Sequence, residues 1–237
     1  MDIKNKVAVV TGAGKGIGRA ISMALAKEGA SLAILSRNKK DLDLLAREAS
    51  NYGNKTLPIT IDLSRESLIK NAISEVAAKL GGVDILINNA GLGRFGRIEE
   101  LTSKDWDEMF ETNLRGMFLC IRETLPHLKR KSESVIVNIS SLAGKNTFAG
   151  GAGYCATKWG VMALSKCLML EERENGVRTI VVCPGSVDTH FFAHPSLPNP
   201  KRDKVLKPQD VADTIMTAIK LPQRAMVSEI ELRPTNP

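Results

Sequence analysis

The chain has 237 residues, of which 43% are hydrophobic and 25% are charged, and its formal net charge is +7. This length fits one large α/β domain over residues 1–237, with enough apolar residues for a sizeable core. The 33 basic residues are scattered among 26 acidic ones, which favours a solvated basic surface over a nucleic-acid-binding one.

The cysteines give no sign of a metal site. Cys120, Cys155, Cys167 and Cys183 have no C-x-x-C spacing and form no ligand pattern with the three histidines, so we expect reduced thiols and no bound metal. The first residues lead directly into a strand-like segment without the apolar region of a signal peptide, and no apolar run is long enough to span a membrane. We therefore expect a cytoplasmic protein that has no membrane partner.

Short β-branched runs alternate with longer amphipathic segments, which is the pattern of βαβ units on a parallel sheet. The runs are almost continuously apolar, so we expect these strands to be buried on both faces. The sequence predicts strands over residues 7–10, 32–35, 57–61, 83–87, 135–139 and 180–183, and an alternating edge strand over residues 228–233.

Helices are expected between these strands. Apolar residues recur at helical spacing from Ile17 to Leu25 and again over residues 68–80. Thr102 begins a T-S-K-D stretch that resembles a capping box and predicts a helix start. A further helix is expected over residues 114–129, and Pro208 suits the first turn of a closing helix. Helices should therefore cover both faces of the sheet.

Residues 186–206 interrupt the alternation. This segment contains Phe191, Phe192 and several prolines, and it reads as a long loop of the kind that is usually functional. We expect it to lie on the substrate side of a binding site.

A glycine-rich stretch, T-G-A-G-K-G-I-G, follows the first expected strand and opens the first expected helix. Glycines let the backbone turn tightly and approach a pyrophosphate, and the N–H groups at the helix start attract the anion. With the strand before it and the helix after it, the stretch predicts a dinucleotide site. Its residues are Gly12, Gly14, Lys15, Gly16, Ile17 and Gly18.

The end of the second expected strand bears on the choice of nucleotide. An acid at this place holds the ribose hydroxyls and repels a 2′-phosphate, whereas this chain has Ser36 followed by Arg37. Lys15 in the glycine stretch is placed to bind the same phosphate from the other side. The sequence therefore predicts a preference for NADP(H).

Tyr154 precedes Lys158 by four residues, and Ser141 lies thirteen residues upstream of the tyrosine. On a helix, side chains at i and i+4 lie on the same face, so the phenol and the ammonium should point the same way. A neighbouring cation favours the phenolate, so we expect Lys158 to lower the phenol's pKa from its usual value of about 10. The three residues form a candidate proton-transfer unit.

Together these motifs resemble the short-chain dehydrogenase/reductase family, in its compact single-domain branch, over nearly the whole chain. The resemblance rests also on N-N-A-G at 88–91, N-L-R-G around Asn113, S-S-L-A-G around Ser141 and P-G-S-V-D-T at 184–189. It implies an α/β Rossmann-type, doubly wound, mainly parallel seven-stranded sheet. It also implies a homodimer or homotetramer acting on a small-molecule carbonyl or alcohol.

The resemblance assigns roles to four residues. Tyr154 is the general acid/base, and Lys158 both lowers its pKa and holds the nicotinamide ribose. Ser141 hydrogen-bonds the substrate oxygen, and Asn113 holds a water or backbone group that links the lysine to solvent. The cofactor contacts that it implies beyond the glycine stretch are Ser36, Arg37, Asp62, Leu63, Asn89, Ala90, Gly91, Tyr154, Lys158, Pro184, Gly185, Val187 and Thr189.

Three functions fit this set of residues. The first is NADP(H)-dependent interconversion of a carbonyl and a secondary alcohol. The second is 3-oxoacyl-carrier-protein reduction, for which the cationic run at Lys129 to Lys131 could dock an acidic carrier. The third is a catalytically silent NADPH-binding regulator, which the presence of all four catalytic residues disfavours.

Overall fold

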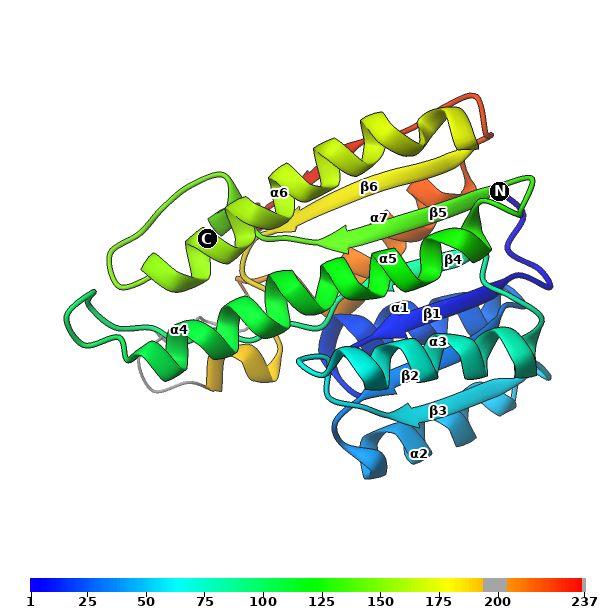
Figure 1. Ribbon diagram of the computed structural model, residues 1–237, viewed down its shortest axis with the longest axis horizontal. Helices are drawn as coiled ribbons and strands as arrows, with labels where there is room; N and C mark the ends of the chain where they lie inside the picture. The colour runs from blue at the N-terminus through cyan, green and yellow to red at the C-terminus, as the bar shows by residue number, and fades with distance from the viewer. Residues whose placement is uncertain (194–203, 236–237) are drawn as a thin grey trace.

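A computed structural model describes residues 1–193 and 204–235 (Figure 1). Its centre is a seven-stranded sheet in the order β3-β2-β1-β4-β5-β6-β7, and every neighbouring pair of strands is parallel. The strands are β1 (Val7–Thr11), β2 (Ser31–Ser36), β3 (Thr56–Thr60), β4 (Ile85–Asn88), β5 (Ser134–Ile139), β6 (Val177–Pro184) and β7 (Glu229–Leu232). The predicted doubly wound α/β fold is confirmed.

Helices connect the strands and cover both faces of the sheet (Figure 1). They are α1 (Gly16–Lys27), α2 (Lys39–Ser50), α3 (Glu66–Leu80), α4 (Ser103–Phe110), α5 (Gly116–Leu128), α6 (Ala152–Glu172) and α7 (Pro208–Lys220). Short turns complete the set: a π-helical turn η1 (Glu111–Arg115) and the 3₁₀ turns η2 (Leu142–Gly144), η3 (Arg173–Asn175) and η4 (His190–Ala193).

Two apolar clusters lie on opposite faces of the sheet, because successive strand residues point to opposite sides. Ala8 and Val10 of β1 join the cluster under α1, α2 and α7, whereas Val7 and Val9 join the one under α3, α5 and α6. Completely buried large side chains such as Ile21 of α1 each stabilise the fold by about 1.5–3 kcal/mol. This packing fixes where each strand ends.

Two sequence expectations were wrong in detail. The expected strand over residues 57–61 is not buried on both faces: β3 is only partly buried because it forms one edge of the sheet, the position at which Pro58 is tolerated. The helix expected over residues 114–129 is not separate, because η1 joins α4 to α5 in one continuous helical segment. Most of the expected loop at 186–206 lies outside the described residues.

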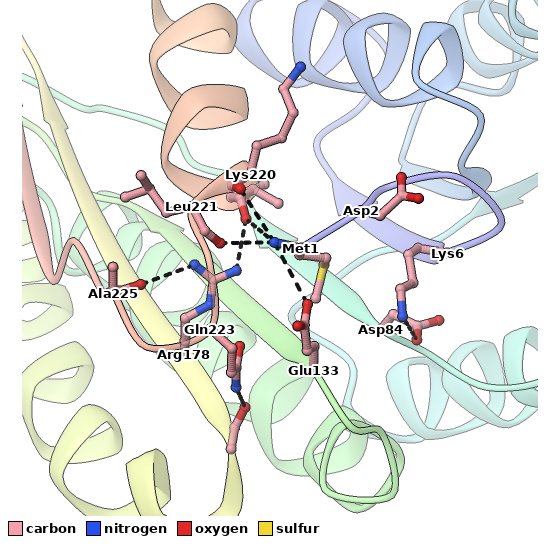
Figure 2. A network of polar contacts seen from close by, with 12 residues as sticks. Met1, Asp2, Lys6, Asp84, Glu133, Arg178, Lys220, Leu221, Gln223 and Ala225 are labelled. Atoms are coloured by element: carbon pink, nitrogen blue, oxygen red, sulfur yellow. Dashed lines mark hydrogen bonds and ion pairs between the residues drawn. The ribbon is translucent and has the colours of Figure 1, made fainter.

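The amino ends of the strands are closed by a polar network (Figure 2). The amino group of Met1 donates to the carbonyl oxygen of Leu221 at 2.8 Å, and the buried Arg178 of β6 donates to that of Ile219 at 2.8 Å. Cations at a helix C-terminus complement its dipole, so these contacts fix the end of α7 against the sheet. The opposite, carboxyl ends of the strands are left to form a site.

Candidate active site

The order in which strands are added to the sheet reverses between β1 and β4: β2 and β3 lie on one side of this pair, and β5 to β7 lie on the other. In open α/β sheets a ligand crevice forms at this point, outside the carboxyl ends of the strands. A cavity of about 1460 Å³ opens there. Single ligand pockets usually have roughly 300–1,000 Å³, so the cavity has room for more than one ligand.

The glycine stretch forms the turn between β1 and α1. Gly12 and Gly16 have φ angles of 63° and 58°, in the left-handed region that favours glycine. A Cβ at Gly18 would lie 2.4 Å from the carbonyl oxygen of Gly12 and 2.5 Å from the Asn89 amide nitrogen, so no side chain fits there. The first turn of α1 has no side-chain cap, which leaves its N–H groups available to an anion.

The N-N-A-G segment supports this turn. The Asn89 side chain donates to the carbonyl oxygens of Thr11 and Gly12, both at 3.1 Å. The hydroxyl of Thr11 accepts from the backbone N–H groups of Asn89 and Ala90 at 3.0 and 3.1 Å. The ends of β1 and β4 are thereby held in one geometry at the cavity floor.

Cationic side chains gather where β2 ends. Arg37 and Lys15 both line the cavity, as predicted, and Lys39 and Lys40 line it as well. A hydrogen bond from the backbone N–H of Ser64, at 3.0 Å, and to a lesser extent the charge of Arg37 hold the pKa of Asp62 below its usual value. Asp62 therefore stays ionised beside this cationic group.

Ser141, Tyr154 and Lys158 meet at the other end of the cavity, as the sequence predicted. Ser141 caps η2, accepting from the N–H of Ala143 at 3.1 Å, and it lines the cavity together with Tyr154. Lys158 is buried, lies 5.7 Å from the centroid of the Tyr154 ring, and donates to the carbonyl oxygen of Ile139 at 2.9 Å. Helix α6 and the end of β5 are thus joined at this point.

Burial controls the protonation of this group. It raises the pKa of Tyr154 to about 12, although the nearby Ser141 side chain partly lowers it. It also lowers the pKa of Lys158 to about 8, because desolvation disfavours the ammonium. The expectation that Lys158 lowers the pKa of the Tyr154 phenol was wrong. Desolvation of the phenol outweighs the interactions within the protein that favour the phenolate.

Asn113 lies behind the cavity wall in η1 and is buried. Its side chain donates to the Leu92 carbonyl oxygen at 2.8 Å and to the Thr157 hydroxyl at 3.1 Å, and it accepts from the Leu92 N–H at 2.8 Å. Because Thr157 precedes Lys158, these bonds fix the loop after β4 against α6. π-Helical turns are frequent at functional sites.

Most residues predicted to contact a cofactor line this cavity. Gly18 and Asn113 lie behind it, and the lining also includes Lys39, Lys40, Asn146, Phe148 and Arg233, which belong to none of the motifs. The basic run R-N-K-K was the one available signal for the lysines, whereas the other three come from loops brought together by folding. The lining residues anticipated from the sequence are Gly12, Gly14, Lys15, Gly16, Ile17, Ser36, Arg37, Asp62, Leu63, Asn89, Ala90, Gly91, Ser141, Tyr154, Lys158, Pro184, Gly185, Val187 and Thr189.

Comparison with known proteins identifies the family. The sequence profile described as short chain dehydrogenase matches residues 6–197. The chain belongs to the short chain dehydrogenase family. An uncharacterized oxidoreductase of Staphylococcus aureus strain MW2 is 34% identical to this short chain dehydrogenase over 232 residues, which are 98% of each chain. The family inferred from the motifs is confirmed.

Solved structures with similar sequences share the whole fold. An alcohol dehydrogenase from the archaeon Thermococcus sibiricus, complexed with 5-hydroxy-NADP, superposes with a TM-score of 0.90 at 35% identity, over 97% of each chain. A 3-ketoacyl-ACP reductase from Sinorhizobium meliloti 1021 superposes with a TM-score of 0.88 at 31% identity, over 96% of this chain and 97% of that one.

Within residues 1–193 and 204–235, no helix is long and apolar enough to cross a membrane.

Proposed function

We propose that this chain is an NADP(H)-dependent oxidoreductase that interconverts a carbonyl group and a secondary alcohol on a small molecule. The observation that carries the proposal is that Ser141 and Tyr154 line one cavity beside the buried ammonium of Lys158, which lies 5.7 Å from the centroid of the Tyr154 ring. A hydroxyl donor, a phenol and a fixed cation are suited to proton transfer at a carbonyl oxygen. The same cavity continues to the glycine turn, so a nucleotide and a substrate could meet there.

The residues around the glycine turn fit a dinucleotide. The space that side chains at Gly12 and Gly18 would fill is already taken by the N-N-A-G segment, so backbone atoms form the cradle for a pyrophosphate. Lys15 and Arg37 would hold a 2′-phosphate, and Asp62 the adenine side. The Thermococcus sibiricus enzyme was crystallised with an NADP derivative, which supports the same choice here. When bound, NADP(H) supplies the hydride.

Tyr154 is the general acid/base in this proposal. Its pKa of about 12 keeps the phenol protonated at neutral pH, as an acid that protonates a carbonyl oxygen must be. Ser141 donates a hydrogen bond to that oxygen and stabilises its developing charge. Lys158 holds the nicotinamide ribose, and Asn113 is a positioning residue that acts through Leu92 and Thr157.

The test is a screen of NADPH oxidation over aldehydes, diketones, 3-oxo acids and acyl thioesters, with serine and 3-hydroxy acids for the reverse direction. NADPH binding is measured in parallel by calorimetry. We expect turnover of at least one carbonyl class. Binding of NADPH with no turnover across the whole panel would instead favour a silent regulator.

A second candidate is 3-oxoacyl-carrier-protein reduction, since the Sinorhizobium meliloti structure is a 3-ketoacyl-ACP reductase. The position and the ion pairs of the cationic run at Lys129 to Lys131, which could dock a carrier, argue against this second candidate. Lys129 pairs with Glu172 at 2.8 Å and Lys131 with Asp84 at 3.5 Å. Both follow α5 and precede β5, so they lie at the amino ends of the strands, opposite the cavity. Acyl-thioester turnover far above that of other carbonyls would restore this candidate.

A further inference from the structure

Three phenylalanines from three separate loops form one group of rings beside Tyr154, and we call Phe95, Phe148 and Phe191 the aromatic wall. Phe95 lies after β4, Phe148 between η2 and α6, and Phe191 in η4 after β6. The rings of Phe95 and Phe191 each have their centroids 5.4 Å from that of Tyr154, and 5.9 Å from each other. Phe148 extends the wall, with its ring 6.1 Å from that of Phe95.

Glycines let these rings pack directly against the backbone. A Cβ at Gly93 would lie 2.4 Å from Cζ of Phe95 and 2.8 Å from Cζ of Phe191, and one at Gly151 would lie 2.6 Å from Cζ of Phe148. Cβ contacts this short do not occur in proteins, so the rings occupy space that only glycine leaves open. The aromatic wall therefore depends on glycine at both positions.

The two loops that carry Phe95 and Phe148 are tied to each other. The N–H of Gly96 donates to the carbonyl oxygen of Gly150 at 3.0 Å. In the third loop, the N–H of Phe191 donates to the hydroxyl of Thr189 at 3.3 Å. The wall is thus held by backbone hydrogen bonds on the cavity side where Ser141 and Tyr154 lie.

Two arginines that line the cavity are already paired with carboxylates. Arg94 lies 2.9 Å from Glu108 and 3.4 Å from Asp105, and Arg233 lies 2.6 Å from Glu231. The buried Lys158 is bonded to a backbone carbonyl, and the His190 side chain is exposed to solvent. A substrate carboxylate at the wall would lose its hydration and would have to compete with these pairs for a partner.

Resting on the proposed function, we infer that the substrate is an uncharged ketone whose carbonyl carbon bears an aryl group, and that this ring packs on the aromatic wall. Tyr154 contacts the wall and lines the same cavity as Ser141, so a carbonyl held by these two hydroxyls has its substituent beside Phe95 and Phe191. Edge-to-face and offset ring contacts each correspond to about 2- to 12-fold in affinity beyond apolar burial.

Four α-keto compounds test the effects of the aryl ring and of the carboxylate charge independently: methyl benzoylformate, methyl pyruvate, benzoylformate and pyruvate. The four ketones differ in intrinsic reactivity, so each kcat/KM with NADPH is divided by the compound's rate of reduction by borohydride, and the remaining differences report recognition of the ring and of the carboxylate. We expect methyl benzoylformate to exceed both methyl pyruvate and benzoylformate by at least about tenfold. A methyl pyruvate value equal to or above that of methyl benzoylformate would overturn the inference, as would a benzoylformate value equal to or above it.

The outcomes also distinguish this inference from the proposed function. If none of the four is reduced while other carbonyls of the screen are, the aryl-ketone inference fails and the oxidoreductase stands. If NADPH binds and no carbonyl at all is reduced, the proposed function fails and this inference fails with it.

Substitutions in the aromatic wall test whether it causes the preference for the aryl ketone. Phe95→Leu and Phe191→Leu should each lower the methyl benzoylformate to methyl pyruvate ratio by about 3- to 10-fold, mainly through KM, with NADPH affinity unchanged as the check on folding. Phe118→Leu is the matched control, since Phe118 is an exposed residue of α5 outside the cavity. An unchanged ratio in both wall variants would show that the wall does not recognise the ring.

Discussion

The ammonium of Lys158 donates a hydrogen bond to the carbonyl oxygen of Ile139, the last residue of β5, at 2.9 Å. Lys158 is only 4% exposed, so its ammonium loses its hydration on folding and gains a hydrogen bond to one backbone carbonyl. This arrangement fixes α6 to the sheet at the site, and it costs folding free energy that a neutral residue would not.

That cost predicts how stability depends on pH. The lysine's pKa falls from 10.5 to about 8 on folding, which corresponds to roughly 3 kcal/mol. Between about pH 8 and 10.5 the unfolded chain binds more protons, so the free energy of unfolding should rise with pH in this window. Denaturant unfolding of the wild type and of Lys158→Met should show the wild type gaining up to about 3 kcal/mol relative to the variant. A difference that stays constant from pH 7 to 10.5 would refute the buried charge.

Arg37→Asp should weaken the preference for NADPH over NADH by about 10- to 100-fold, because a charge-assisted hydrogen bond is lost and a carboxylate repels the 2′-phosphate. The ratio of the two kcat/KM values measures the effect. Arg47→Asp makes the same charge change on an exposed face of α2 outside the cavity and should leave the ratio unaltered. An unchanged preference in the Arg37 variant would count against the phosphate site.

Asn113→Ala should lower the free energy of unfolding by about 1–3 kcal/mol, because it leaves the partly buried N–H and carbonyl groups of Leu92 without their partner. Denaturant unfolding measures this loss. Asn51→Ala, at an exposed position after α2, should change stability by less than about 0.5 kcal/mol. Equal effects of the two substitutions would show that Asn113 does not hold the loop.

The regular parts of the fold could be predicted because they rest on local pattern. Apolar runs predicted β1 to β6, the alternation of polar and apolar residues predicted β7, and the glycine stretch predicted the turn before α1. The π-helical turn at Asn113 could not be predicted, because no residue in E-T-N-L-R distinguishes it from an α-helix. The partial exposure of β3 follows from its place at the sheet edge, which depends on the pairing of distant strands.

In the site, too, some features could be predicted from the sequence and others could not. Ser141, Tyr154 and Lys158 were identified from their order and spacing along the chain. The contact between Gly93 and the rings of Phe95 and Phe191 depends on how two loops meet, which sequence spacing does not encode. The raised pKa of Tyr154 was missed for a similar reason, since desolvation comes from the folded surroundings of the phenol.

Gly93→Ala should change substrate choice more than stability. The added methyl would meet the ends of the Phe95 and Phe191 side chains, which can move, so we expect a stability loss below about 1 kcal/mol. The displaced rings should lower kcat/KM for methyl benzoylformate several-fold. Gly96→Ala on the same loop is the control, because its Cβ would have its nearest contact at 3.5 Å, with the Glu100 side chain. Equal effects of the two alanines would contradict the packing argument.

The most direct test of the central claim is Tyr154→Phe, measured for both NADPH binding and carbonyl reduction. The substitution removes the phenol oxygen and retains the ring that packs against Phe95 and Phe191. General acid catalysis contributes about 10²- to 10⁴-fold, so kcat should fall by that factor while the Kd for NADPH changes by less than about threefold. Substantial turnover in a variant that still binds NADPH would contradict the role of Tyr154 as the proton donor.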